Sequence, residues 1–252
     1  CRGLDDTLGA ECRHRQAENN DEPKELLERN EGKKTKHMTL NFSNGDNMPA
    51  LGLGTWKSKP GEVKEAIIKA VEIGYRHIDC AAIYKNEAEI GEAFAECFAR
   101  GLVKREELWV TSKLWNDAHR SEDVQPALQQ TLSDLQLDYL DLYLVHWPVA
   151  FEKGTDFPTS VDGYLPLTEV PLSETWNAMQ HLQHDGLVRH IGTSNFSPKK
   201  LQHLMDLEGQ GPEMNQVELH PYLQQTDLID FCRSNGIHVT AYSPLGSMDR
   251  HE

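Results

Sequence analysis

Three strand-like segments at a regular spacing constrain the fold of this chain most strongly. The segments are YRHIDCAAIY, LWVTSKLW and YLDLYLVHWP, and they carry Asp79, Lys113 and His146. These three residues lie 34 and 33 residues apart, which is the length of one helix plus one strand. Such a repeat is typical of a parallel βα barrel, in which the carboxyl ends of the strands converge on one face. We therefore expect Asp79, Lys113, His146 and Tyr84 to meet at one site suited to proton transfer.

The rest of the chain continues the alternation of strands and helices. Strands are predicted at 51–54, 77–81, 108–114, 139–146, 188–193, 213–219 and 238–242. Between them, apolar residues at helical spacing predict buried helix faces. The residues of the first three faces are Val63, Ala66, Ile67, Ala70 and Val71, then Ile90, Phe94, Cys97 and Phe98, then Val124, Leu128, Leu132 and Leu135. Ser121 and the pair Ser197-Pro198 are predicted helix starts.

The predicted fold class is α/β, a (β/α)₈ TIM barrel truncated after its seventh strand. Asn44-Gly45 is a hairpin turn signal, so a β-hairpin is expected to cap the barrel at its N-terminal side. Only ten residues follow Tyr242, which leaves no room for an eighth strand with its helix. Residues 1–37 are predicted to be a disordered, charged tail, with Met38 as the natural start. Residues 38–252 are predicted to form the barrel, incomplete at its C-terminal end.

Composition narrows the classes of partner. The formal net charge of −15 would repel phosphate backbones and anionic lipids, so neither nucleic acid nor a membrane is an expected partner. The five cysteines show neither a CxxC pair nor the spacing of a disulfide framework. We expect free thiols in a reducing, cytoplasmic setting.

Seven motifs in order resemble the aldo-keto reductase family, and within it the aldehyde-reductase branch. They are GLGTWKS, YRHIDCAAIYKNEAEIGEA, VTSKLWND, LDLYLVHWP, GTSNFSPKKL, NQVELHPY and VTAYSPLGS. The resemblance implies a monomeric, metal-free enzyme that uses NADPH to reduce a small aldehyde or ketone. Tyr84 matches the family's proton donor, Lys113 the ammonium that lowers the pKa of that tyrosine, and Asp79 the partner of the lysine. His146 matches the imidazole that orients the substrate carbonyl.

The resemblance also implies a cofactor site. Tyr242 matches the ring that stacks on nicotinamide, and Ser194, Asn195 and Gln216 match the groups that bind its carboxamide. The remaining matching positions are Thr55 and Trp56 beside the nicotinamide, Ser243, Leu245 and Ser247 near the pyrophosphate, and Trp56 with Trp147 as walls for an apolar substrate. The basic residues that bind the 2′-phosphate in relatives come after the seventh strand, so the preference for NADPH over NADH stays open.

Other interpretations remain. Singly, Asp79, Lys113 or Tyr84 could be a strand-end or surface residue, and His146 a core hydrogen-bonding residue. The histidines outside the site share no metal-ligand spacing. A nucleotide-binding relative with little turnover and a structural, crystallin-like protein are the two alternative functions.

Overall fold

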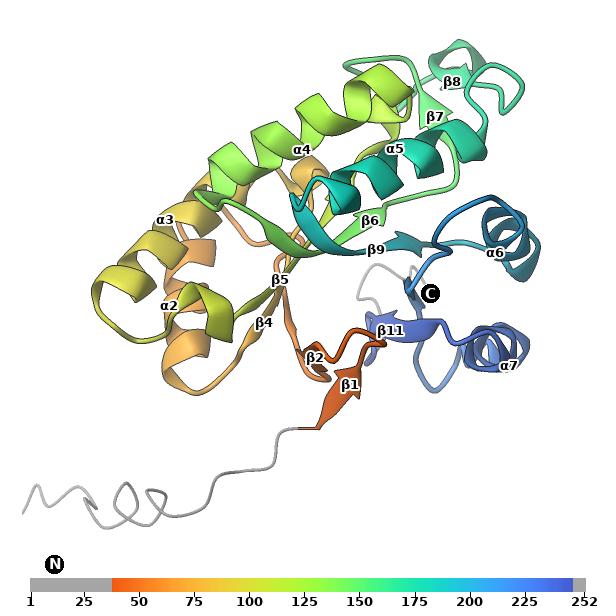
Figure 1. Ribbon diagram of the computed structural model, residues 1–252. Helices are drawn as coiled ribbons and strands as arrows, with labels where there is room; N and C mark the ends of the chain where they lie inside the picture. The colour runs from red at the N-terminus through yellow and green to blue at the C-terminus, as the bar shows by residue number, and fades with distance from the viewer. Residues whose placement is uncertain (1–37, 247–252) are drawn as a thin grey trace, which may run out of the picture. The chain divides into compact units, whose positions relative to one another are not determined.

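Seven parallel strands form the main sheet of the protein (Figure 1). A computed structural model describes residues 38–246 of the 252. The predicted α/β barrel is confirmed, with the strands in the sheet order β11-β10-β9-β6-β5-β4-β3. Their bounds are β3 Leu53–Gly54, β4 His77–Asp79, β5 Trp109–Leu114, β6 Leu140–Val145, β9 Val188–Ser194, β10 Met214–Glu218 and β11 His238–Tyr242. The predictions for residues 1–37 lie outside the described residues.

Helices follow the strands in the predicted alternation. They are α2 Val63–Glu72, α3 Glu87–Ala99, α4 Ser121–Leu135, α5 Leu172–His184, α6 Pro198–Met205 and α7 Thr226–Ser234. Short 3₁₀ turns are η1 Ala82–Tyr84, η2 Arg105–Glu107, η3 Asn116–Ala118 and η4 Val161–Gly163. Within 38–246, no helix is long and apolar enough to cross a membrane.

Apolar helix faces pack on the outer faces of the strands to form the main core. The predicted face of α4 is buried in full, and that of α3 is buried except for Phe98, which packs against the core while partly exposed. On α2 the prediction for Ala66 was wrong, because Ala66 is exposed and Ile68 instead packs partly against the core. Because a helix has 3.6 residues per turn, the five predicted positions spread over a wider part of the helix surface than the core covers. Ala66 lies at the edge of that set and is left exposed.

Of the two predicted helix starts, one is confirmed and the other is wrong by one position. Ser197 is the N-cap of α6 and Pro198 its first residue, as expected. For α4 the prediction was wrong by one position, because Ser121 is already helical and Arg120 is the N-cap. The Ser121 amide instead donates to Glu174 Oε1, at 3.2 Å, so a carboxylate from α5 satisfies one of the free amides of the helix start.

Two small antiparallel pairs accompany the barrel. The predicted hairpin consists of β1 Thr39–Asn41 and β2 Asn47–Pro49. The other pair, β7 Ala150–Phe151 with β8 Tyr164–Leu165, lies in the long connection after β6 and was not predicted.

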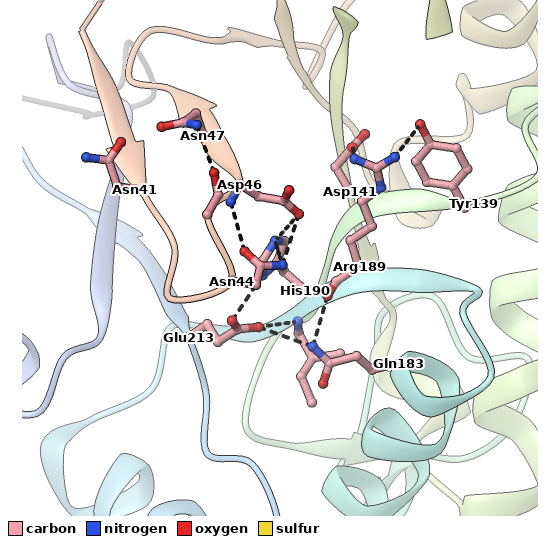
Figure 2. Close-up of polar contacts among 12 residues, drawn as sticks. Asn41, Asn44, Asp46, Asn47, Tyr139, Asp141, Gln183, Arg189, His190 and Glu213 are labelled. Atoms are coloured by element: carbon pink, nitrogen blue, oxygen red, sulfur yellow. Dashed lines mark hydrogen bonds and ion pairs between the residues drawn. The ribbon is translucent and has the colours of Figure 1, made fainter. Parts of the chain in front are cut away.

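A buried histidine holds the hairpin turn to the amino ends of the strands (Figure 2). His190, on β9, lies 3.0 Å from Asp46 Oδ2 through Nε2 and 3.0 Å from Glu213 Oε1 through Nδ1. Its ring also packs against Phe42 at 4.1 Å and against Trp109 at 5.3 Å between centroids. Burial opposes the charge of His190, but the two carboxylates outweigh it and raise the pKa of His190.

This cluster predicts a pH-dependent contribution to stability. A raised histidine pKa in the folded state adds stability that is fully present below the unfolded pKa, ~6.5, and is lost as the pH rises through the folded pKa. The pKa of Asp46 is lowered, so that residue stays ionised throughout this window. We expect His190→Asn to cost more in urea unfolding at about pH 5.5 than at about pH 8.5. The matched control His203→Asn, at an exposed site on α6, should cost less than about 0.5 kcal/mol.

The sheet has two unpaired edges within residues 38–246, at β3 and β11. Residues of β11 are mostly half-buried, whereas all six of β5 and of β6 are buried. Exposed parallel edges offer free backbone groups to other chains. We therefore expect the 252-residue chain on its own to associate in size-exclusion chromatography, and Ala241→Lys on the β11 edge to reduce that association. A cooperative thermal melt with a monomeric elution profile would contradict this expectation.

Candidate active site

A buried ion pair lies at the centre of the site. Lys113 is on β5 with only 1% of its side chain exposed, and its Nζ donates to Asp79 Oδ1 at 2.5 Å and to the Cys80 carbonyl at 2.8 Å. Burial disfavours the ammonium, but the Asp79 carboxylate outweighs it, so the pKa of Lys113 is raised above its usual range. Lys113 is therefore a fixed positive charge inside the barrel.

Tyr84 lies beside this charge. It is the last residue of η1, which begins three residues after β4 ends, and the Lys113 Nζ is 5.3 Å from its ring centroid. Burial raises the pKa of Tyr84, while Lys113 lowers it, and the net direction is upward. The predicted effect of Lys113 is present, but it does not dominate, because burial penalises the phenolate more. Tyr84 is therefore a protonated phenol at neutral pH.

His146 follows β6 and faces the phenol. Its ring centroid is 5.9 Å from that of Tyr84 at an interplanar angle of 78°, and 5.0 Å from that of Trp115 at 75°. Burial, and then the charge of Lys113, hold the pKa of His146 well below its usual range. The imidazole is neutral, and its Nδ1 is buried without a hydrogen-bond partner among the described residues.

Amide and hydroxyl groups from β9, β10 and β11 continue the site. Gln216 Nε2 donates to Asp79 Oδ2 at 2.7 Å, so Asp79 is held from both sides. The Ser194 hydroxyl donates to the Gln216 carbonyl at 2.8 Å, and Asn195 Nδ2 donates to the His146 carbonyl at 3.0 Å. The Tyr242 hydroxyl donates to Asn195 Oδ1 at 2.9 Å, which fixes the plane of its ring. The structure thus brings together eight predicted residues from the ends of six strands: Asp79, Tyr84, Lys113, His146, Ser194, Asn195, Gln216 and Tyr242.

The other predicted residues lie further from this centre or are more exposed. Thr55 is buried, and its hydroxyl donates to the Asp79 carbonyl at 2.9 Å. Trp56 and Trp147 are 54% and 41% exposed, and Leu245 is 97% exposed. Ser243 has a φ of 47° and accepts from the Gly246 amide in a tight turn. Ser247 lies outside the described residues.

Trp115 was missed as a site residue. Besides packing on His146, it contacts Phe157 of the long connection at 5.4 Å, and its Nε1 donates to the Asp156 carbonyl at 3.0 Å. Side chains alternate along a strand, so the residue two after Lys113 points to the same face. That spacing was the signal that could have identified Trp115.

Within residues 38–246, no group of three or more His, Cys, Asp or Glu side chains is arranged to hold a metal ion.

Comparison with known proteins identifies the family. The profile of the Aldo/keto reductase family matches residues 50–248. The chain belongs to the aldo/keto reductase family. The membership predicted from the motifs is therefore confirmed.

Individual relatives agree with this assignment. An aldo/keto reductase of Synechocystis is 58% identical over 209 residues, and the human aldo-keto reductase family 1 member A1 is 55% identical over 208. These matches cover 83% and 82% of this chain and 64% of each relative, so the chain spans just under two thirds of their length.

Two solved structures show the same fold. An aldose reductase from Schistosoma japonicum is 45% identical with a TM-score of 0.79 and covers 82% of this chain and 69% of its own. A Bombyx mori aldo-keto reductase in complex with NADP is 42% identical with a TM-score of 0.73, and covers 82% of this chain and 66% of its own.

Removal of one partner of the buried ion pair is expected to lower the free energy of unfolding by a large amount. Asp79→Asn would leave Lys113 buried with a neutral amide and the Cys80 carbonyl, and breaking a buried pair costs about 3–5 kcal/mol. We expect the free energy of unfolding in urea to fall by about 3 kcal/mol, the lower end, because Asn keeps one acceptor oxygen. Asp206→Asn, the same change at an exposed site on the end of α6, should cost less than about 0.5 kcal/mol. Equal costs for the two variants would contradict the role of the pair.

Proposed function

We propose that this protein reduces aldehydes or ketones to alcohols with NADPH, and that Tyr84 donates the proton. The observation that carries this proposal is the arrangement of Lys113, a buried ammonium fixed by Asp79 and 5.3 Å from the ring centroid of a protonated Tyr84. A phenol with a fixed cation beside it can give up its proton as negative charge develops on a carbonyl oxygen, because the cation stabilises the phenolate that remains.

Each residue of the group has a separate part in the proposal. Tyr84 stays protonated at neutral pH because burial raises its pKa, so it is ready to act as an acid in the direction of reduction. Lys113 lowers the cost of forming the phenolate, and Asp79 keeps Lys113 charged. His146 is neutral, so it can donate one hydrogen bond to the carbonyl oxygen without competing for the proton of Tyr84.

The strand-end groups fit a nicotinamide. A carboxamide both donates and accepts hydrogen bonds, and Ser194, Asn195 and Gln216 offer a hydroxyl and two amides from adjacent strands. Tyr242, anchored through its hydroxyl, holds an aromatic face beside them. NADPH, when bound, supplies the hydride. Trp56 and Trp147 are proposed to contact an apolar substrate, and Thr55, Ser243, Leu245 and Ser247 to contact the cofactor.

The relatives support the same reaction class. The Bombyx mori structure contains NADP, and the Schistosoma japonicum structure is an aldose reductase. Several relatives at 54% to 56% identity are named aldo-keto reductase family 1 member A1, which supports the aldehyde-reductase branch. Three described cysteines, Cys80, Cys97 and Cys232, are free and buried, which supports a reducing, cytoplasmic setting. We propose that the full-length protein is a monomer and that its partner is a small carbonyl compound.

Replacement of the proton donor tests the proposal. In the full-length protein, Tyr84→Phe removes the transferable proton and keeps the ring. We expect turnover of a simple aldehyde, followed at the nicotinamide absorbance, to fall by ~10²–10⁴-fold. Nucleotide binding, followed by fluorescence titration, should change less than about threefold, because the phenol is not proposed to hold the cofactor.

Tyr222→Phe is the matched control, since Tyr222 is 90% exposed. It should retain full turnover. Wild-type turnover in Tyr84→Phe would refute the role of this phenol, and nucleotide binding without turnover in the unaltered protein would favour the regulatory alternative.

A further inference from the structure

An ion pair joins the turn that carries Tyr84 to the long connection after β6. Lys85 directly follows Tyr84 and has a left-handed backbone conformation, with a φ of 57°. Such a conformation is sparsely populated for residues other than glycine, so contacts around it must stabilise it. The Lys85 Nζ lies 2.8 Å from Asp156 Oδ1 in the connection. The two residues are 71 positions apart in the sequence, so the pair fixes tertiary rather than local structure.

Asp156 is also tied to the aromatic side chains beside His146. Its backbone carbonyl accepts a hydrogen bond from Trp115 Nε1 at 3.0 Å. Phe157, the next residue, lies 5.4 Å from Trp115 between ring centroids at an interplanar angle of 66°, an edge-on contact. Trp115 is in turn 5.0 Å from the ring of His146. Asp156 therefore links the Lys85 ammonium to the aromatic side chains next to the proposed carbonyl site.

The part of the connection that holds Asp156 has little apolar packing of its own. We call residues 152–157 the tethered segment. They are mostly exposed, and the Phe157 side chain is 69% exposed. An open groove of about 410 Å³ adjoins the segment, and its lining includes Lys85, Trp115, Ala127 and Asp156. Segments with few buried apolar contacts open at low cost, so the position of this one depends on its polar contacts.

Two further polar contacts reach the tethered segment from the start of α4. Lys153 forms an ion pair with Asp123, and the Gly154 amide donates to Asp117 Oδ2 at 3.1 Å. Figure 1 shows β7, which directly precedes the segment, close to the start of α4, and β7 packs against η3. These contacts hold the segment to α4, and the Lys85–Asp156 pair holds it to the turn of Tyr84.

We propose that Lys85 and Asp156 are positioning residues for the binding of bulky, apolar carbonyl substrates. Their ion pair holds the tethered segment so that Phe157 stays against Trp115. This role rests on the proposed reduction of carbonyl compounds. An aldehyde with a phenyl group can extend from His146 along these aromatic side chains, whereas a small aldehyde such as propanal has no apolar body to place there. The pair therefore acts on KM for bulky substrates and leaves proton transfer unchanged.

The exposure of the pair limits the size of its effect. The Lys85 and Asp156 side chains are 65% and 56% exposed. Ion pairs at such sites contribute modestly and are screened by salt, because water competes for both charges. We therefore expect removal of the pair to change KM by a few-fold without loss of activity, and the change to vanish at high ionic strength.

Charge reversal in the full-length protein tests the pair, with 3-phenylpropanal and propanal as substrates that differ by one phenyl group. Lys85→Glu and Asp156→Lys each replace the attraction by a repulsion. At low ionic strength we expect each variant to raise KM for 3-phenylpropanal ~3- to 5-fold, with kcat and the KM for propanal within about twofold of wild type. The double variant Lys85→Glu/Asp156→Lys restores a pair of opposite polarity and should return KM to within about twofold of wild type. At about 1 M salt the differences should disappear.

Hydrogen–deuterium exchange of the substrate-free protein tests the tether without use of the reaction. The peptide that covers residues 152–157 should exchange at least ~3-fold faster in each single variant than in the wild type or the double variant. Lys69→Glu is the matched control, because Lys69 forms an exposed ion pair with Glu72 at 3.3 Å on α2. It should change neither KM nor the exchange of this peptide.

Several outcomes would overturn the proposal. They are a wild-type KM for 3-phenylpropanal in both single variants, equal increases in KM for the two aldehydes, no recovery in the double variant, and unchanged exchange of residues 152–157. A wild-type protein that reduces neither aldehyde would refute the proposed function and with it the role in substrate binding. Faster exchange in the single variants would then show that the ion pair holds the segment without serving that reaction.

Discussion

The site depends on the buried pair of Lys113 and Asp79. An ammonium with 1% exposure is stable inside the barrel only because a carboxylate lies 2.5 Å away and a backbone carbonyl at 2.8 Å. Gln216 holds the second oxygen of Asp79, so three different strands must be in register for the charge to be tolerated. The pair thus links the folding of the barrel to the electrostatics at Tyr84 and His146. Its positive charge acts in opposite ways on the two, favouring the phenolate of Tyr84 and disfavouring the imidazolium of His146.

Much of the fold follows from local pattern. The strand Leu140–Val145 is buried at every position and is apolar except for Asp141 and the Tyr143 hydroxyl, which is typical of a parallel strand covered on both faces. The pair β7–β8 could not be read in the same way, because each strand has two residues and lies in a Pro- and Gly-containing connection. Ser121 shows a further limit. Its expected capping role is replaced by Glu174, whose approach depends on the packing of α5 against α4.

The sequence predicted those site residues whose position follows from the topology of a parallel barrel. Asp79, Lys113 and His146 were identified because parallel strands bring their carboxyl ends together. The net pKa of Tyr84 was not predictable, because it depends on the balance between burial and the charge of Lys113, and burial is a property of the folded chain. The burial of Glu87 was not predicted from the sequence, for a similar reason. An acidic residue in the first turn of α3 has an ordinary explanation in the helix dipole, and only the packing of α4 and β5 over it makes it buried.

Side chains alternate along β5 between the outer and the inner face of the barrel, and this links the groups on the two faces. Ser112 points outward to Glu87, and its neighbour Lys113 points inward to Asp79 and Tyr84. The charge of Lys113 therefore reaches Glu87 through one strand, where it lowers the pKa of that carboxyl. The effect is reciprocal, because two interacting groups stabilise each other's charged forms equally. Ionisation of Glu87 on the outside must favour the ammonium on the inside, so the protonation state of Glu87 and the electrostatics of the inner site are coupled across a single layer of backbone.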